Sequence, residues 1–203
     1  MAAASDLLTA NEASAVSGVS IKAVYKLARE RLPREAVVRK SGKMFLTTAG
    51  AVCVRLDREL PKDVPVKVRR ALYRMVKTGP QDRIEYGAGA FRYVLETEPA
   101  ANAVTGELAA YRRALDLITE DPDIQAGAAT FKGTRILVHP ICDLLAQGVA
   151  PDELKDDYPS LTDAMLAAAP LYARTHPRRG RPRTPAWRSG EPTSETRVKR
   201  TAA

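Results

Sequence analysis

The sequence predicts a mainly α-helical protein with small β elements, an α+β fold built from several small modules. Apolar residues recur mostly at helical spacing, in runs that glycine and proline separate. Strand-like runs are short and stand beside glycine turns. With 203 residues, 45% of them apolar and 5% aromatic, the chain can bury one good core or two small ones.

The charge of the chain changes sign along its length. Residues 1–60 carry a net charge of +4 and residues 61–118 one of +3. Residues 119–173 carry −6, and residues 174–203 carry +7. Such a distribution favours segments with different partners over a diffusely basic protein.

Bulk features indicate a cytoplasmic protein with no membrane contact. No stretch approaches the ~20 apolar residues of a membrane span, and the N-terminus lacks the basic-then-apolar order of a secretory signal. Cys53 and Cys142 stand far apart in separate apolar patterns, which favours buried reduced thiols over a disulfide or a metal site.

The first module begins with two helices joined by a tight turn. Thr9 and Glu12 have the spacing of a capping box, which predicts a helix over 10–17. Gly18 permits the turn, and Ser20 can cap a second helix whose apolar residues recur at helical spacing: Val24, Leu27 and Ala28. On this second helix Lys22, Lys26 and Arg29 follow i, i+4, i+7 spacing, with Tyr25 beside them. This basic face can meet phosphates and base edges in a major groove, although a solvated helix face is the alternative.

A hairpin and a third helix complete this module. The run "AVVRKSGKMFLTT" predicts two strands around Ser41-Gly42, with Lys40 and Lys43 at a basic tip, and Thr48 as the cap of a helix over 49–60. This order resembles the winged helix-turn-helix of the MerR family over Leu7 to Leu60, which implies a DNA-binding domain at 1–60. The residues expected to contact DNA are Ser20, Lys22, Tyr25, Lys26, Arg29, Lys40 and Lys43.

The middle segment, 61–118, is expected to connect the modules and to take part in dimerisation. Pro65 stands near the start of a predicted short helix that ends at Gly79. The run "RIEYGAGAFRYVLE" predicts strand material interrupted by Gly87 and Gly89, and 106–118 an amphipathic helix. An exposed strand edge here could pair with its copy in a dimer.

Residues 119–173 form the third module, with two short strands and then three short helices. Helices are predicted over 140–148, from Pro151 and after the cap Thr162, and Pro170 is expected to kink or stop the last of them. The motifs Asp121-Pro122, Gly133-Thr134-Arg135-Ile136 and Asp157-Tyr158-Pro159 with Leu161-Thr162 closely resemble the domain-of-unknown-function family 433, DUF433. The resemblance implies a tri-helical, helix-turn-helix-like domain of VapB-type antitoxins, which are usually encoded beside a PIN-like ribonuclease toxin.

The extended basic tail, 174–203, has two candidate partners. The stretch "RGRPR" resembles the core of an AT-hook, which lies in an A·T minor groove. The ribonuclease implied by the resemblance gathers acidic residues, to which arginine binds with two bonds at a time. Toxin-binding residues on this interpretation are Arg178, Arg179, Arg181 and Arg183, with Trp187 as the anchor.

Two functions follow from these observations. The first is an antitoxin that neutralises the ribonuclease, represses its own operon at operator DNA, and acts as a homodimer or as a hetero-oligomer with the toxin. The second is a stand-alone MerR-like regulator with an AT-hook tail. We expect no enzymatic activity or cofactor, because His139 and His176 have no Cys or Ser nucleophile at a recognisable spacing. We also expect no metal site, because the clustered carboxylates of Asp152, Glu153, Asp156 and Asp157 lie in one helical region with no partnering His or second cluster.

Overall fold

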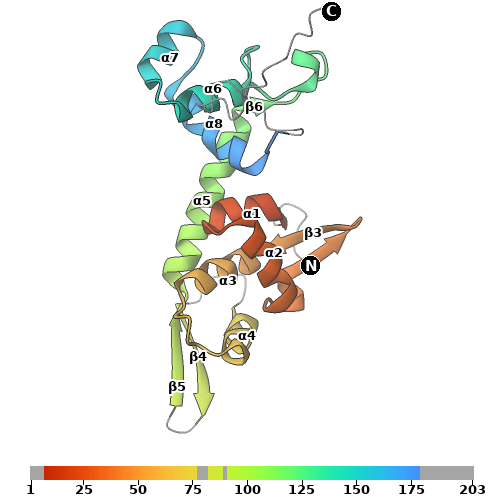
Figure 1. Ribbon diagram of the computed structural model, residues 1–203, viewed down its shortest axis with the longest axis vertical. Helices are drawn as coiled ribbons and strands as arrows, with labels where there is room; N and C mark the ends of the chain where they lie inside the picture. Colours follow the sequence, from red (N-terminus) through yellow and green to blue (C-terminus); the bar gives the residue numbers. More distant parts are fainter. Residues whose placement is uncertain (1–6, 77–81, 89–90, 179–203) are drawn as a thin grey trace, which may run out of the picture.

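The computed structural model describes residues 7–76, 82–88 and 91–178, and it is an α+β fold in which helices dominate. Helix α5 (Glu98–Asp116) runs through the molecule as a central rod (Figure 1). The N-terminal elements lie beside its middle, a β-hairpin extends from its first end, and the C-terminal helices gather at its last end. The fold class predicted from the sequence is confirmed.

The N-terminal elements alternate helices with a small sheet. Their order is β1 (Leu7–Thr9), α1 (Ala10–Ser17), α2 (Ile21–Glu30), a 3-10 turn (Arg34–Ala36), β2 (Val37–Lys40), β3 (Lys43–Thr47) and α3 (Thr48–Glu59). The strands form an antiparallel sheet in the order β1-β3-β2, so Leu8 lies opposite Leu46. The predicted hairpin around Ser41-Gly42 is present. Strand β1 was not predicted, because three residues are too few to show a period of two.

Capping residues set the ends of these helices. The Thr9 hydroxyl accepts a hydrogen bond from the Glu12 amide and the Glu12 carboxylate accepts one from the Thr9 amide, which completes the predicted capping box. Gly18 ends α1 in the left-handed conformation (φ 67°), and Ser20 caps α2. The predicted cap of α3, Thr48, is wrong by one residue. Thr47 has the extended backbone of a cap and accepts from the Gly50 amide, whereas Thr48 is already helical.

The middle segment forms a helix and a two-stranded hairpin. Helix α4 (Val66–Met75) follows Pro65 and ends before Gly79, which lies outside the described residues. Strands β4 (Arg83–Ala88) and β5 (Phe91–Glu96) pair antiparallel, so the predicted strand material is a hairpin. Helix α5 starts well before the predicted 106–118. Its first turns bury Ala100 and Val104 against the N-terminal elements, and this tertiary packing has no clear signal in a run of small residues.

The C-terminal elements form a second compact group. They are β6 (Ile118–Thr119), a 3-10 turn (Gln125–Gly127), β7 (Thr130–Phe131), α6 (Val138–Ala146), α7 (Pro151–Asp157) and α8 (Asp163–Thr175). The three predicted helices are confirmed, with Thr162 as the cap of α8. The expected stop at Pro170 is wrong, since α8 continues to Thr175. It packs against α1, α5 and α6, which offsets the hydrogen bond that proline cannot donate.

Two apolar cores hold the structure together. The first extends from Leu8 to Tyr111 and fully buries Leu46, Leu56, Leu72 and Tyr73. The second surrounds Phe131, Ile141 and Leu154, and Leu115 of α5 packs against both. Helix α5 therefore connects the two cores rigidly. Among the described residues, no helix is long and apolar enough to cross a membrane.

Candidate nucleic-acid interface

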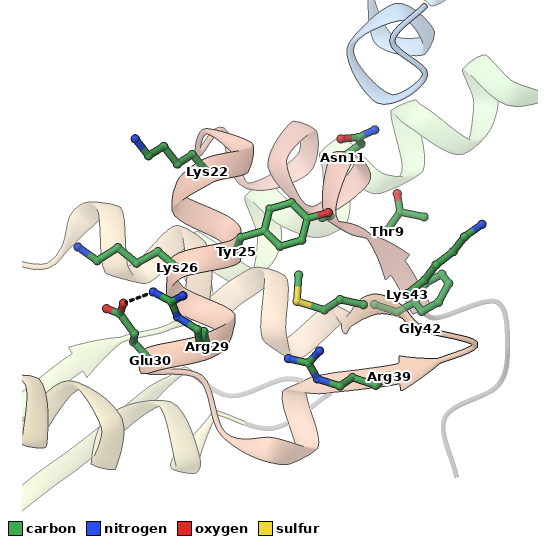
Figure 2. A pocket seen from close by; sticks show the side chains of 13 residues that line it. Thr9, Asn11, Lys22, Tyr25, Lys26, Arg29, Glu30, Arg39, Gly42 and Lys43 are labelled. Atoms are coloured by element: carbon green, nitrogen blue, oxygen red, sulfur yellow. Dashed lines mark hydrogen bonds and ion pairs between the residues drawn. The ribbon is translucent and has the colours of Figure 1, made fainter. Parts of the chain in front are cut away.

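A groove of about 950 Å³ lies between α2 and the β2–β3 hairpin (Figure 2). Helix α2 forms one wall, the hairpin the opposite wall, and the start of α1 closes one end. The groove is lined by Thr9, Ala10, Asn11, Lys22, Tyr25, Lys26, Arg29, Glu30, Arg39, Gly42, Lys43, Met44 and Phe45. This lining contains five basic side chains and a single acidic one, so the groove is suited to a polyanion.

Helix α2 presents its predicted basic face to this groove. Lys22, Lys26 and Arg29 are exposed, and Tyr25 between them is 53% exposed. On the opposite face Val24 and Leu27 are buried in the first core. The amphipathic pattern therefore fixes the orientation of α2, and the four predicted side chains lie together along one surface (Figure 2).

The structure places the remaining predicted residues differently. Lys43 lines the groove, but Lys40 does not, although it is exposed beside Lys43 at the hairpin end. Ser20 is exposed and accepts a hydrogen bond from the Ala23 amide, so its role here is to cap α2.

Among the lining residues that sequence reasoning missed are Arg39, Thr9 and Asn11. Because side chains alternate between the two faces of a strand, the sequence could have shown that Arg39 and Lys40 lie on opposite faces of β2. Thr9 and Asn11 gave no such signal, because they reach the groove only through the packing of β1 against β3.

The single acidic residue of the groove is partly neutralised. The Glu30 carboxylate forms an ion pair with the Arg29 guanidinium at 3.1 Å, and the dashed line in Figure 2 marks it. Arg29 keeps a 77% exposed side chain and can still contact a second anion.

The basic surface continues beyond the groove toward α4. A neighbouring hollow shares Arg29, Glu30 and Arg39 with the first groove, and it adds four further arginines: Arg31, Arg34, Arg70 and Arg74. Arg70 donates to the Glu30 carbonyl oxygen at 2.6 and 2.9 Å. It thus satisfies a carbonyl that has no partner within the helix at the C-terminal end of α2. Helix α4 thus extends the positive surface and supports α2.

A buried ionic cluster fixes α2 on the helices behind it. The Asp57 carboxylate accepts hydrogen bonds from Arg31, Arg69 and the Tyr73 hydroxyl. Burial alone would raise the pKa of the Asp57 carboxyl, but the hydrogen bonds from these three partners outweigh burial and hold the pKa below its ordinary value. Burial and the same carboxylate raise the pKa of Tyr73.

A second hollow, of about 1010 Å³, lies where α1 meets the C-terminal elements. It shares Thr9, Asn11 and Lys43 with the groove, and its other wall includes Tyr172 and Arg178. The Asn11 side-chain amide donates to the Thr175 carbonyl at 3.0 Å, and Arg174 donates to the Ala15 carbonyl at 3.1 Å. The end of α8 is therefore anchored beside the end of the groove that α1 closes.

The described part of the basic tail ends at Arg178. The exposed Arg178 guanidinium forms an ion pair with Asp143 of α6 at 2.7 Å. The other predicted toxin-binding residues, Arg179, Arg181, Arg183 and Trp187, lie outside the described residues.

One of the four acidic residues of α7, Asp152, forms a surface ion pair with Lys155. Lys155 binds Asp152 at 2.9 Å and Asp163 at 2.8 Å. Within residues 7–76, 82–88 and 91–178 no cluster of three or more His, Cys, Asp or Glu side chains could hold a metal ion. Cys53 is buried and Cys142 half-buried, and both are free thiols.

The comparisons with known proteins give one family match, in the C-terminal group, and one relative that aligns with most of the chain. Residues 118–173 match the family described as "Protein of unknown function (DUF433)", which covers β6 to most of α8. The chain is also similar to "Uncharacterized protein y4eO" of Sinorhizobium fredii (strain NBRC 101917 / NGR234), with 25% identity over 194 residues. That alignment covers 90% of this chain and 87% of the relative. No solved structure matches the chain.

Proposed function

We propose that this protein binds double-stranded DNA through the groove between α2 and the β2–β3 hairpin, and that it is the antitoxin and autorepressor of a toxin–antitoxin pair. The observation that supports DNA binding best is the convergence of Lys22, Lys26, Arg29, Arg39 and Lys43 on one groove. These side chains come from a helix and a hairpin, the two elements that winged helix-turn-helix proteins of MerR type place on DNA.

The mode of binding follows from the geometry of the groove. Helix α2 enters the major groove, with Tyr25 and Arg29 toward base edges and Lys22 and Lys26 toward phosphates. The hairpin lies along the adjacent backbone, where Arg39 and Lys43 meet phosphates. The ion pair between Arg29 and Glu30 opens when Arg29 meets its anion, at little cost because both side chains are exposed.

The antitoxin part of the proposal rests on the DUF433 match and on the position of the tail. The tail leaves α8 beside Asn11, a residue of both the groove and the hollow where α1 meets the C-terminal elements. A ribonuclease held by the arginines of the tail would therefore lie next to the operator, which links toxin level to repression. The alternative is a stand-alone regulator whose tail binds A·T-rich DNA.

A titration of DNA affinity against salt tests DNA binding. The ligand is the DNA upstream of the gene, and the variants are Lys22→Ala with Lys26→Ala and, as a control of equal charge, Lys62→Ala with Lys67→Ala. Lys62 and Lys67 are exposed, but they line neither the groove nor the neighbouring hollow toward α4. We expect the groove variant to lower affinity and to reduce the slope of log K against log salt by about 2. Equal slopes for both variants would exclude the groove as the DNA site.

Co-expression with the product of the adjacent gene tests the antitoxin role. The full chain and a chain that ends after Arg178 are compared for rescue of growth and for co-purification. Loss of both in the shortened chain supports toxin binding by the tail. Full rescue by the shortened chain would assign the tail to DNA, and an adjacent gene product without toxicity would overturn the antitoxin role.

A further inference from the structure

The β4–β5 hairpin has a free edge. The hairpin extends from the start of α5 away from the rest of the molecule (Figure 1). Helix α4 packs against β4, so β5 is the outer strand. Within the described residues the sheet contains these two strands alone, and β5 is hydrogen-bonded on one side. An isolated two-stranded hairpin is marginally stable, and an open edge is a template for another strand.

The register of the hairpin shows which backbone groups point to this edge. The Thr97 amide donates to the Asp82 carbonyl at 2.9 Å, so these two residues form a hydrogen-bonded pair. Because hydrogen-bonded pairs alternate along an antiparallel ladder, Leu95 and Tyr93 also face β4. The backbone amides and carbonyls of the intervening residues, Arg92, Val94 and Glu96, therefore point away from β4 into solvent.

The side chains along this strand are exposed as well. Val94 is 52% exposed and Tyr93 39% exposed, so the strand offers apolar surface beside its free backbone groups. Arg92, Val94 and Glu96 share one face, since side chains alternate along the strand. Along this face the side chains are therefore basic, apolar and acidic in turn.

We propose that β5 pairs antiparallel with β5 of a second copy of this chain, with Val94 opposite Val94 of the second copy. In this register the three outward residues of one strand meet the three of the other as hydrogen-bonded pairs. The same register places Arg92 opposite Glu96 of the second copy, twice by symmetry. The backbone pattern and the charges thus select one register independently, and a continuous four-stranded sheet results.

This proposal does not depend on the DNA-binding role, but it bears on it. A twofold axis at Val94 relates two copies of the groove, which suits an operator with inverted half-sites. Because the surface is self-complementary in charge and hydrogen bonding, the occupant is a second copy and not an unrelated strand.

Charge exchange across the strand tests the pairing. The full chain, free of DNA, is studied by sedimentation equilibrium as wild type, Arg92→Glu, Glu96→Arg and the double variant. We expect a wild-type dimer and about tenfold or greater weakening in each single variant, because two attractive pairs become repulsive. The double variant should dimerise again, and an equimolar mixture of the two single variants should form a heterodimer.

Arg83→Glu is the matched control. Arg83 and Arg92 both form ion pairs with Glu85, at 3.2 and 3.3 Å, and their side chains are 63% and 68% exposed. Arg83 lies on β4 opposite Glu96, and its replacement removes an ion pair to the same Glu85 without changing a residue of the free edge itself. Thermal melts confirm that all variants fold. A monomeric wild type, or equal association of the Arg92→Glu and Arg83→Glu variants, would overturn the proposal.

Discussion

Arg31 donates from one guanidinium nitrogen to both carboxylate oxygens of Asp57, at 2.8 and 3.1 Å. Arg31 follows the last turn of α2, and Asp57 belongs to α3. The same carboxylate accepts from Arg69 and Tyr73 of α4, at 3.0 and 2.7 Å. One carboxylate therefore fixes the end of the proposed DNA-reading helix on two helices behind it.

Asp57→Asn should destabilise the protein by about 2–3 kcal/mol, because it leaves Arg31 and the buried Arg69 without their shared anion. Urea unfolding measures the change. Glu59→Gln on the same helix is the control. Its ion pair with Arg55 is 48% exposed on the glutamate side, so its loss should cost less than about 1 kcal/mol. Equal losses of unfolding free energy in the two variants would show that Asp57 stabilises the helix packing no more than an exposed ion pair does.

The stability of the protein should fall in acid through Asp57. Since the folded pKa of Asp57 is below its unfolded value of about 3.9, the folded state holds fewer protons on this group. The contribution of Asp57 is present in full above the unfolded pKa and is lost as pH falls from there through the folded pKa. Urea unfolding between pH 5 and about pH 2 should show a steeper loss for the wild type than for Asp57→Asn. Parallel curves would mean that the pKa of Asp57 is not lowered by folding.

The first two helices of the first module and their caps could be predicted because the signals are local. Thr9, Glu12, Gly18 and Ser20 act within a few residues of themselves, and each does what its position predicts. The basic face of α2 follows from the burial of Val24 and Leu27, which a period of 3.6 already indicates.

The rest of the site depends on contacts between distant segments. Asn11 reaches the groove and holds Thr175, 164 residues away, and neither residue has a pattern that indicates its partner. Arg39 and Lys40 are adjacent and equally basic. Strand alternation places them on opposite faces, but only the packing of the hairpin shows which of the two lines the groove. Likewise, α8 continues past Pro170 where it packs against α1, α5 and α6, and local propensity does not predict this packing.

Cys53 should be unreactive in the folded protein. It is 1% exposed, and burial raises the pKa of its thiol to about 12, so almost no thiolate forms at pH 8. Titration with an aromatic disulfide reagent at pH 8 should modify Cys142 alone in the native chain, and both thiols in urea. With Cys142→Ser no thiol should react before unfolding. Rapid reaction of this native variant would show that the first core opens around Cys53.

Two glycine-to-alanine changes should have opposite signs. Gly50 is buried near the start of α3, and a Cβ there would lie 2.6 Å from the backbone oxygen of Ala36, which precedes β2. Gly50→Ala must therefore push the hairpin wall of the groove away from α3, at a cost of about 1–3 kcal/mol. Gly106 lies on the exposed side of α5 with open space around it, so Gly106→Ala should stabilise the helix by about 0.5–1 kcal/mol.

Thermal unfolding and DNA affinity are measured for both glycine variants, and we expect weaker DNA binding for Gly50→Ala alone. Unchanged affinity of a destabilised Gly50→Ala variant would separate the position of the hairpin from DNA binding.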